Sequence, residues 1–400
     1  MSGPLDGRTV VLGVSGSIAS YKAAEIASRL VQAGARVEVA LTRAATEFIT
    51  PLTFRALTGR APYVDMFRDG AEGEAHVELA RRADLLLIAP ASASTLARLA
   101  HGLADDAVSL TALATQAPVL VAPAMDSQMW AHAATQANRA LLAERGVQFL
   151  GPASGRLASG RVGAGRMIEP AAIVDLVKAR LGREHGDLSG RVIVVSAGGT
   201  REAIDPVRFV GNHSSGKMGY AIAEAARDRG ASVVLISSAA LPAPGGVRVV
   251  AVDSARDMLT AVQAECAQAD ALIMAAAVAD YRPAEVAARK IKRAGVDARS
   301  VELVQNPDIV ASVSGDFVKV AFAAETDDLL ANARKKLVAK GAQLMVANDV
   351  TAPDAGFGVD TNRVTILDAD GGSDELPLLS KYDVGQRLLD RVVPLLRARG

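Results

Sequence analysis

The stretch at 192–224, VIVVSAGGTREAIDPVRFVGNHSSGKMGYAIAE, decides the fold of the second half of the chain. Residues 192–195 form an unbroken β-branched run, which is typical of a strand buried on both faces of a sheet. Residues 219–229 repeat apolar side chains at helical spacing. The connection is long, and long loops in compact domains are usually functional. Its polar groups predict a binding loop, with an ordinary solvated loop as the alternative; they include Arg201, Asp205, Arg208, Asn212 and Lys217.

Part of this loop imitates a phosphate-binding P-loop, because residues 211–217 fit G-x-x-x-x-G-K. The next residue, however, is Met218, where a Ser or Thr would hold Mg²⁺, and the segment begins well after the strand has ended. The sequence therefore argues against a P-loop. It leaves a glycine-rich helix N-terminus that suits an anion.

Strands alternate with helical patterns along the whole chain, which predicts parallel sheets with helices on both faces. The fold class is α/β, with two doubly wound, Rossmann-like three-layer domains at 1–182 and 191–400 and a linker at 183–190. We expect first-half strands at 10–14, 37–41, 85–89, 119–122 and 147–150, with helices at 22–33 and 170–181. Second-half strands are expected at 192–195, 232–236, 247–252, 272–275, 318–322 and 344–347, with a late β pair at 364–367 and 376–379.

Composition narrows the class of function. The 400 residues are 50% hydrophobic and carry a formal net charge of zero, so neither nucleic acid nor an anionic membrane is favoured as a partner. No stretch is long and apolar enough to span a bilayer, and the first residues lack a secretory pattern. The single Cys266 excludes an internal disulfide and a multi-thiolate metal site. We expect a cytoplasmic protein.

Polar and small residues follow the predicted first-half strands, and in an open α/β sheet such strand ends meet at the ligand crevice. The turn at Gly16 lacks G-x-G-x-x-G, so NAD is disfavoured and a mononucleotide phosphate suits it better, with a tight packing turn as the alternative. The glycine- and arginine-rich segment 154–167 is either a slack connector or a flap that closes over an anionic substrate. The basic cluster at 289–293, with Lys336 and Lys340, is either a solvated face or a triphosphate site.

Several stretches together resemble the bacterial bifunctional coenzyme A biosynthesis enzymes, in which a phosphopantothenoylcysteine decarboxylase is fused to a phosphopantothenate–cysteine ligase. The resemblance covers nearly the whole chain. The matching stretches are LGVSGSIASYK, TRAATEFITPL, HVELA, ADLLLIAPASA, PAMDSQMW, DPVRFVGNHSSGKMGYAIA, AAAVADYR, KIKR, NPDIV, FAAET and VAND.

For the second domain, the resemblance implies ligation of L-cysteine to 4'-phosphopantothenate with CTP and Mg²⁺, through an acyl-cytidylate. Asn212 matches the residue that handles this intermediate. The resemblance assigns no residue to the metal. The positions that match CTP contacts are Ala275, Ala276, Asp280, Lys290, Asn306, Pro307, Asp308, Ile309, Phe322, Lys336 and Lys340.

For the first domain, the resemblance implies an FMN-dependent decarboxylase. His76 matches the active-site histidine, although a lone histidine at a helix start is usually a surface or capping residue. Asp126 and Ser159 stand where the family has Asn and Cys. The positions that match flavin-binding loops are Gly16, Ser17, Thr42, Pro90, Ala91, Ser92 and Ser94.

Both departures oppose the expected chemistry. The family Asn holds the substrate carboxylate, and an ionised Asp126 about 4 Å away would repel it by roughly 4 kcal/mol, or about a thousandfold in binding. Alternatively, like charge raises its pKa and keeps Asp126 protonated. Ser159 is a much weaker acid than the thiol it replaces.

The leading interpretation is a bifunctional enzyme, with a ligase whose FMN-binding domain no longer decarboxylates as the runner-up. A non-catalytic flavoprotein module and a nicotinamide oxidoreductase are further alternatives. The resemblance also implies a homo-oligomer, in which the decarboxylase domains form trimers and the ligase domains pair as dimers.

Overall fold

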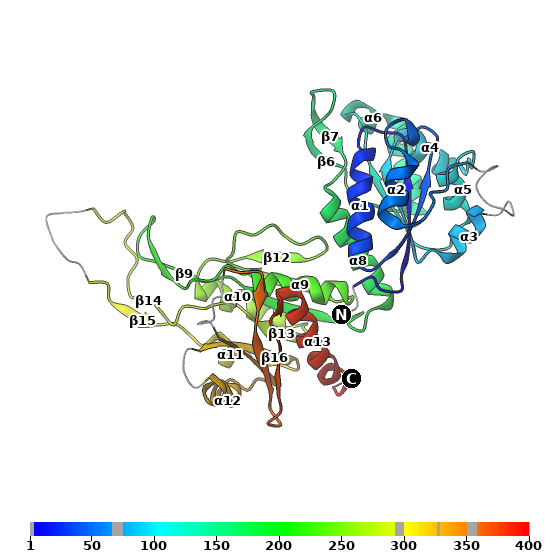
Figure 1. Cartoon of the computed structure of the whole chain (residues 1–400). Coiled ribbons are helices and arrows are strands. Elements are labelled where there is room, and N and C mark those ends of the chain that lie inside the picture. Colours follow the sequence, from blue (N-terminus) through cyan, green and yellow to red (C-terminus); the bar gives the residue numbers. More distant parts are fainter. Residues whose placement is uncertain (1–3, 66–74, 293–299, 326–328, 350–357, 400) are drawn as a thin grey trace. The chain divides into compact units, whose positions relative to one another are not determined.

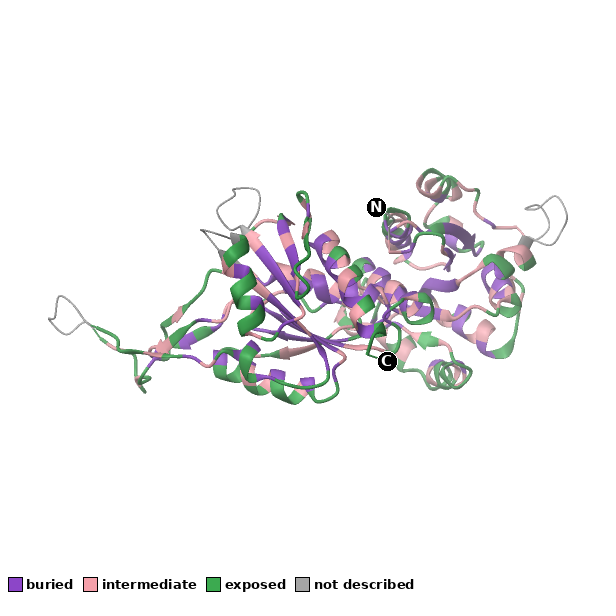
Figure 2. Ribbon diagram, turned by 90° about the horizontal axis from the view of Figure 1, so that it is seen from below, coloured by how far each residue is buried: buried purple, intermediate pink, exposed green. Residues whose placement is uncertain are grey.

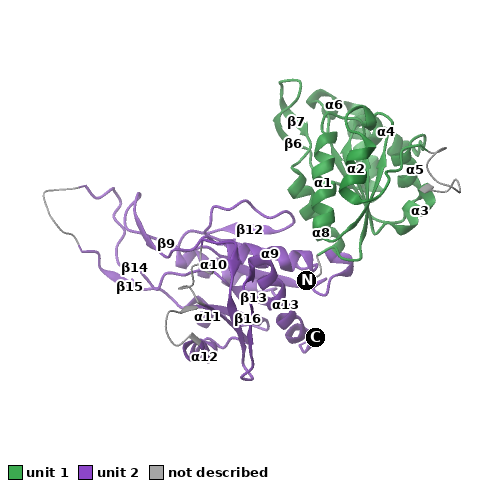
Figure 3. Ribbon diagram, in the orientation of Figure 1, with its two compact units in different colours: residues 1–181 green, residues 182–400 purple. Residues whose placement is uncertain are grey.

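The computed structural model describes residues 4–65, 75–292, 300–325, 329–349 and 358–399. The chain divides into two compact units, unit 1 at 1–181 and unit 2 at 182–400 (Figure 3). Helix α8, Pro170–His185, continues past this division, so the segment expected as a linker, 183–190, begins inside a helix. No described helix could cross a membrane.

Unit 1, coloured from blue to green in Figure 1, is built on a five-stranded parallel sheet in the order β2-β1-β3-β4-β5. Successive residues of β1 face opposite sides: Leu12 packs into one buried cluster and Val11 into another. The sheet is therefore covered on both faces, as its unbroken apolar strands predict. The strands are β1 Thr9–Val14, β2 Arg36–Leu41, β3 Leu85–Ala91, β4 Val119–Pro123 and β5 Gln148–Phe149.

The helices of unit 1 connect these strands and cover the sheet. They are α1 Ser20–Gln32, the 3-10 helix η1 Ala45–Glu47, α2 Pro51–Thr58, α3 Ala75–Arg82, α4 Ala93–His101, α5 Ala107–Ala114, α6 Ser127–Ala131, α7 Ala133–Glu144 and α8. Each strand named above matches an expected one. The prediction of a doubly wound α/β unit is confirmed.

The segment 154–167 is not a slack connector. It forms an antiparallel hairpin of β6 Ala153–Arg156 and β7 Val162–Arg166. Its turn closes through hydrogen bonds from Leu157 N to Arg161 O (2.8 Å) and from Gly160 N to Leu157 O (2.9 Å). Without a run of apolar residues the segment has no local strand signal, and inter-strand pairing organises it instead.

Unit 2 contains an eight-stranded sheet in the order β12-β11-β8-β13-β16-β17-β19-β20. The strands from β12 to β17 are parallel, whereas β19 and β20 run antiparallel at the edge. Two buried clusters cover its faces, and Figure 2 shows the sheet as largely buried. The strands are β8 Val192–Ala197, β11 Ser232–Ser237, β12 Arg248–Ala251, β13 Ala271–Met274, β16 Val318–Glu325, β17 Leu344–Asp349, β19 Val364–Asp368 and β20 Ser373–Glu375.

Of the two late strands expected at 364–367 and 376–379, the structure confirms only the first. Strand β19 forms as expected, but it pairs with β17 and β20, and the expected strand at 376–379 is wrong. Leu379 instead starts β21, Leu379–Ser380, which pairs with β18, Thr361–Asn362. The helices of unit 2 are α9 Lys217–Asp228, α10 Ala255–Cys266, α11 Ile309–Ser312, α12 Leu329–Ala339 and α13 Lys381–Arg397.

Short antiparallel ribbons extend from the sheet of unit 2. Strand β9, Arg201–Ala203, pairs with β10, Phe209–Gly211, inside the loop that follows β8. Strand β14, Tyr281–Pro283, pairs with β15, Leu303–Gln305, after β13. Both ribbons lie beyond the carboxyl ends of parallel strands, where an open α/β sheet binds its ligands.

Candidate functional site

A cleft of about 530 Å³ opens in unit 2 at the carboxyl ends of β8, β13 and β16. The parallel direction of these strands brings their following loops together at one edge of the sheet. Most of the residues expected to bind CTP or the intermediate line this cleft: Asn212, Ala275, Ala276, Asp280, Asn306, Pro307, Asp308, Ile309, Phe322 and Lys340. Lys290 and Lys336 are not among its lining residues and are exposed.

The loop after β13 is held by side chains from neighbouring segments. Ala276 N donates to Ser196 Oγ (3.0 Å), and Ala279 N donates to Thr200 Oγ1 (2.9 Å). The buried Asn306 donates from Nδ2 to the carbonyl of Ala279 (2.8 Å). These contacts fix the backbone of the loop, so the cleft presents a preformed surface to a ligand.

Asn212 reaches the same loop from the segment before α9. Its Nδ2 donates to the carbonyl of Val278 (3.1 Å). The following residues, Ser214 to Lys217, also line the cleft as the chain enters α9. The 12-residue helix begins at Lys217, with Gly216 as its N-cap. Its first backbone N–H groups therefore add a positive end to the cleft.

Lysine side chains make the cleft suitable for an anion. Lys217 Nζ donates to Asp360 Oδ1 (2.7 Å) and to the carbonyl of Gly358 (2.9 Å). Lys340 Nζ lies 3.8 Å from Asp308 Oδ2. Burial, and next the nearby Lys217, lower the pKa of Lys381. An anion beside these ammonium groups would offset their repulsion and the cost of burial.

Asn348, a polar residue at a strand end in the sequence, lines the cleft, whereas sequence reasoning missed Lys381 and Asn362. Lys381 is the first residue of α13, which packs along α9. Its available signal was Ser380, which caps the helix by accepting a hydrogen bond from Asp383 N (3.1 Å). Only the fold brings this helix start to the cleft.

The segment before Lys292 is tied to the loop after β8 through Asp205. This buried carboxylate accepts from Arg208 Nε (3.0 Å) and from Ile291 N (3.1 Å). Arg208 chiefly, together with backbone N–H groups, holds the pKa of Asp205 far below its usual range. Arg208 Nη2 also donates to the carbonyl of Ile291 (2.9 Å). Lys290 therefore sits beside an ordered junction, but outside the cleft.

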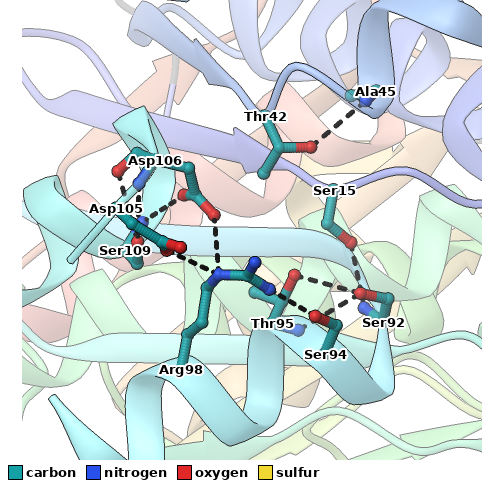
Figure 4. Close-up of polar contacts among 10 residues, drawn as sticks. All are labelled: Ser15, Thr42, Ala45, Ser92, Ser94, Thr95, Arg98, Asp105, Asp106 and Ser109. Carbon is teal, nitrogen blue, oxygen red and sulfur yellow. Dashed lines mark hydrogen bonds and ion pairs between the residues drawn. The ribbon is translucent and has the colours of Figure 1, made fainter. Parts of the chain in front are cut away.

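In unit 1, the expected flavin-binding turns lie next to one another at the carboxyl ends of β1, β2 and β3 (Figure 4). Ser15 Oγ donates to the carbonyl of Pro90 (2.8 Å) and accepts from Ser92 N (2.9 Å). Thr42 Oγ1 accepts from Ala45 N (3.1 Å). The two Ser15 bonds join the turn after β1 to the turn after β3, and Thr42 N donates to Val14 O (3.0 Å) at the ends of β2 and β1. These three turns carry the expected residues: Gly16, Ser17, Thr42, Pro90, Ala91, Ser92 and Ser94.

The turn after β1 has no room for a larger residue at Gly16, because an added Cβ would approach Ala44 Cβ to 2.6 Å. Helix α1 starts directly after this turn. Helix α4 starts after Ser92, whose Oγ caps it by accepting from Thr95 N (3.2 Å). Two helix N-termini are therefore available beside the turns for the phosphate of a mononucleotide.

Asp126 and Ser159 are hydrogen-bonded to each other, although they lie far apart in sequence. Ser159 Oγ donates to Asp126 Oδ2 (2.6 Å), and Arg161 Nη1 lies 3.5 Å from Oδ1. Asp126 also caps α6 by accepting from Gln128 N (3.0 Å). The Ser159 hydroxyl, and next the Gln128 N–H, hold the pKa of Asp126 below its usual range. These contacts favour the ionised carboxylate over the protonated alternative.

His76 lies in the first turn of α3, which packs against α5. Within the described part of the chain, no hydrogen bond or ion pair joins it to Asp126 or Ser159. The same described residues contain no group of three or more His, Cys, Asp or Glu side chains that could hold a metal ion.

Comparisons with known proteins cover both units. Residues 1–182 match the flavoprotein family, and residues 188–395 match the DNA/pantothenate metabolism flavoprotein C-terminal domain. The coenzyme A biosynthesis bifunctional protein CoaBC of Vibrio vulnificus strain CMCP6 is 45% identical over 98% of this chain and 99% of its own. The proteins of the same name from Escherichia coli K12 and Bacillus subtilis 168 are 47% and 45% identical, over 97% and 99% of this chain and 97% and 99% of their own.

Proposed function

The chain belongs to the family of coenzyme A biosynthesis bifunctional proteins, and we propose that it ligates L-cysteine to 4'-phosphopantothenate in unit 2 and decarboxylates the product in unit 1. The observation that carries the proposal is the unit 2 cleft. It gathers Asn212, the segment 275–280 and the segment 305–310 around the side chains of lysines. Such a cleft can hold a polyphosphate and a second, smaller anion.

The ligation that we propose proceeds in two steps. The carboxylate of 4'-phosphopantothenate attacks the α-phosphorus of CTP, forming an acyl-cytidylate and releasing pyrophosphate. The amine of cysteine then attacks the acyl carbon and releases CMP. Both steps depend on positioning and charge neutralisation more than on an acid or base. Lys217, Lys340 and Lys381 supply that charge in the cleft, and we assign Mg²⁺ to the phosphates, which usually bind it.

Unit 1 is a flavoprotein domain by its family, and we propose FMN as its cofactor. The residues present fit this group, because the turns at 15–17 and 90–94 and the N-termini of α1 and α4 can bind its phosphate. When bound, FMN supplies the oxidation of the cysteinyl group that makes loss of CO₂ easy. Around it, Ser159 holds Asp126 ionised, and we assign Asp126, Ser159 and His76 to the substrate site.

A second candidate function is a ligase whose unit 1 binds FMN without decarboxylating. The ionised Asp126 favours it, because direct contact would repel a substrate carboxylate. The test measures CO₂ release from phosphopantothenoylcysteine by the purified FMN-loaded protein, with CTP-dependent pyrophosphate release from the same preparation as the folding control. Release of both products supports the bifunctional enzyme. Pyrophosphate without CO₂ would leave only the ligase.

We also propose that the protein is a homo-oligomer. Large apolar side chains are exposed on the ribbons of unit 2, among them Val207, Phe209, Tyr281 and Leu303. Another exposed set lies at the turns and helix starts of unit 1, namely Ile18, Tyr21, Phe48 and Leu52. Grouped apolar exposure of this kind is typical of protein interfaces. It supports self-association, and the assignment of dimer contacts to unit 2 and trimer contacts to unit 1 is taken from the family resemblance.

A further inference from the structure

The hairpin β6–β7 sets the position of Arg161 beside Asp126. Met125 N donates to the carbonyl of Gly165 (2.9 Å), which joins the hairpin to the turn between β4 and α6. Gly165 has a φ of 145°, and an added Cβ would approach the carbonyl oxygen of Met125 to 2.3 Å. Only glycine fits so close an approach. The hairpin is therefore seated against this turn in a fixed register.

Asp126 accepts hydrogen bonds through both carboxylate oxygens, whereas the Arg161 side chain keeps most of its surface exposed. Asp126 accepts through Oδ1 from Gln128 N and Arg161, and through Oδ2 from Ser159. Arg161 has an exposed side chain, at 54%, and in the described part of the chain Asp126 is the one acceptor that its guanidinium contacts. A guanidinium carries five N–H donors in a planar fork that matches a carboxylate. Most of those donors face solvent.

We propose that Arg161 binds the carboxylate of the decarboxylase substrate and that Asp126 is the positioning residue that holds its guanidinium. This proposal rests on the function proposed for unit 1. An exposed ion pair contributes little to stability, so stability alone does not explain why one carboxylate receives both Ser159 and Arg161. With Arg161 between them, Asp126 and the substrate carboxylate share a cation instead of repelling each other directly.

The proposal predicts a specific kinetic signature. As CO₂ departs, negative charge leaves the carboxylate, so Arg161 stabilises the bound substrate more than the transition state. Its loss should therefore raise KM by about tenfold or more, the effect of losing a hydrogen bond between charged groups, without an equal fall in kcat. A residue with a merely structural role would reduce kcat as well.

The test measures binding to the full-length, FMN-loaded protein by isothermal titration calorimetry. One probe is the serine analogue of phosphopantothenoylcysteine, which keeps the carboxylate but has a hydroxyl in place of the thiol. The other is the matching ethanolamine amide, which lacks the carboxylate. The ratio of the two affinities measures recognition of the carboxylate. Any binding of the probes to unit 2 is the same in all variants, because Arg161 lies in unit 1.

Wild type should prefer the carboxylated probe, and Arg161→Gln should reduce that preference about tenfold or more, with the affinity for the other probe kept within about twofold. Arg161→Lys should restore part of the preference. The matched control is Arg156→Gln, which changes an exposed arginine at the end of β6 in the same hairpin and should keep the wild-type ratio. A wild-type ratio in Arg161→Gln, or an equal loss for both probes, would overturn the proposal.

A double-mutant cycle tests the role of Asp126. In an Asp126→Asn background the amide can itself donate to the carboxylate, so Arg161→Gln should cost less than in wild type. An undiminished cost would refute Asp126 as the positioning residue. CO₂ release is measured separately. An Arg161-dependent preference without CO₂ release would support this assignment while refuting decarboxylation.

Discussion

Replacing Gly165 by alanine should detach the β6–β7 hairpin while leaving the rest of unit 1 folded. Gly165 has a φ of 145° and an added Cβ would lie 2.3 Å from Met125 O, so the native geometry cannot persist. A non-glycine residue in such a region costs about 1–3 kcal/mol, and loss of the bond from Met125 N costs about 0.5–1.5 kcal/mol. Together these costs amount to about 1.5–4.5 kcal/mol, which lowers the ratio of docked to undocked hairpin about 10- to 1,600-fold.

Two assays follow this change. CO₂ release should fall strongly, because Ser159 and Arg161 leave Asp126, whereas CTP-dependent pyrophosphate release by unit 2 should stay near wild type. Limited trypsin digestion should cut faster after Arg156 and Arg161. Gly59→Ala is the control, since Gly59 also has a positive φ, 70°, but an added Cβ there meets no described atom within 4 Å. Wild-type CO₂ release together with wild-type resistance to trypsin would refute the docking argument.

Four further predictions concern single residues. Asn306→Ala removes the buried hydrogen bond to the Ala279 carbonyl, which costs about 1–3 kcal/mol. The KM for CTP in pyrophosphate release should therefore rise about tenfold to a hundredfold. An unchanged KM would contradict this role of Asn306. The pKa of Lys381 is lower in the folded protein than in the unfolded chain. At pH values between these two pKa values the unfolded chain binds more protons, so the free energy of unfolding rises with pH. Urea unfolding between pH 8 and pH 11 should show a smaller rise of this free energy in Lys381→Met than in wild type. Burial raises the pKa of the Cys266 thiol to about 12, so a disulfide reagent at pH 8 should label the native protein far more slowly than the urea-unfolded protein. Phe209→Ser should weaken self-association, measured by light scattering, and an unchanged mass would argue against the ribbon as an interface.

The unit 2 cleft was largely predictable because its residues follow buried parallel strands. The apolar runs at β8 and β13 identify those strands, and their common direction brings the loops with Asn212 and Asn306 to one edge. Lys381 was not predicted as a cleft residue, because contacts between segments distant in sequence bring it there. It reaches the cleft because α13 packs along α9 and because β21 pairs with β18, and neither contact has a signature near Lys381.

The periodicity of apolar residues does not predict the hairpin at 153–166. Its sequence is rich in glycine and arginine with little apolar surface, so it predicts no strand and leaves a slack connector and a flap as alternatives. The strands pair because the turn at 157–160 closes them and because Gly165 fits against Met125. Both causes depend on backbone geometry. The strand propensities of the individual residues therefore do not predict the hairpin.

The departures at Asp126 and Ser159 oppose decarboxylation only when each is considered alone. The fold places the hydroxyl of Ser159 2.6 Å from the Asp126 carboxylate, so the two positions form one hydrogen-bonded unit, with Arg161 at its edge. An isolated carboxylate would repel the substrate, but a carboxylate that also carries a guanidinium presents a net neutral pair with unused donors. Under the function proposed for unit 1, recognition of the substrate carboxylate therefore depends on these three residues together, and two of them, Ser159 and Arg161, lie on the β6–β7 hairpin.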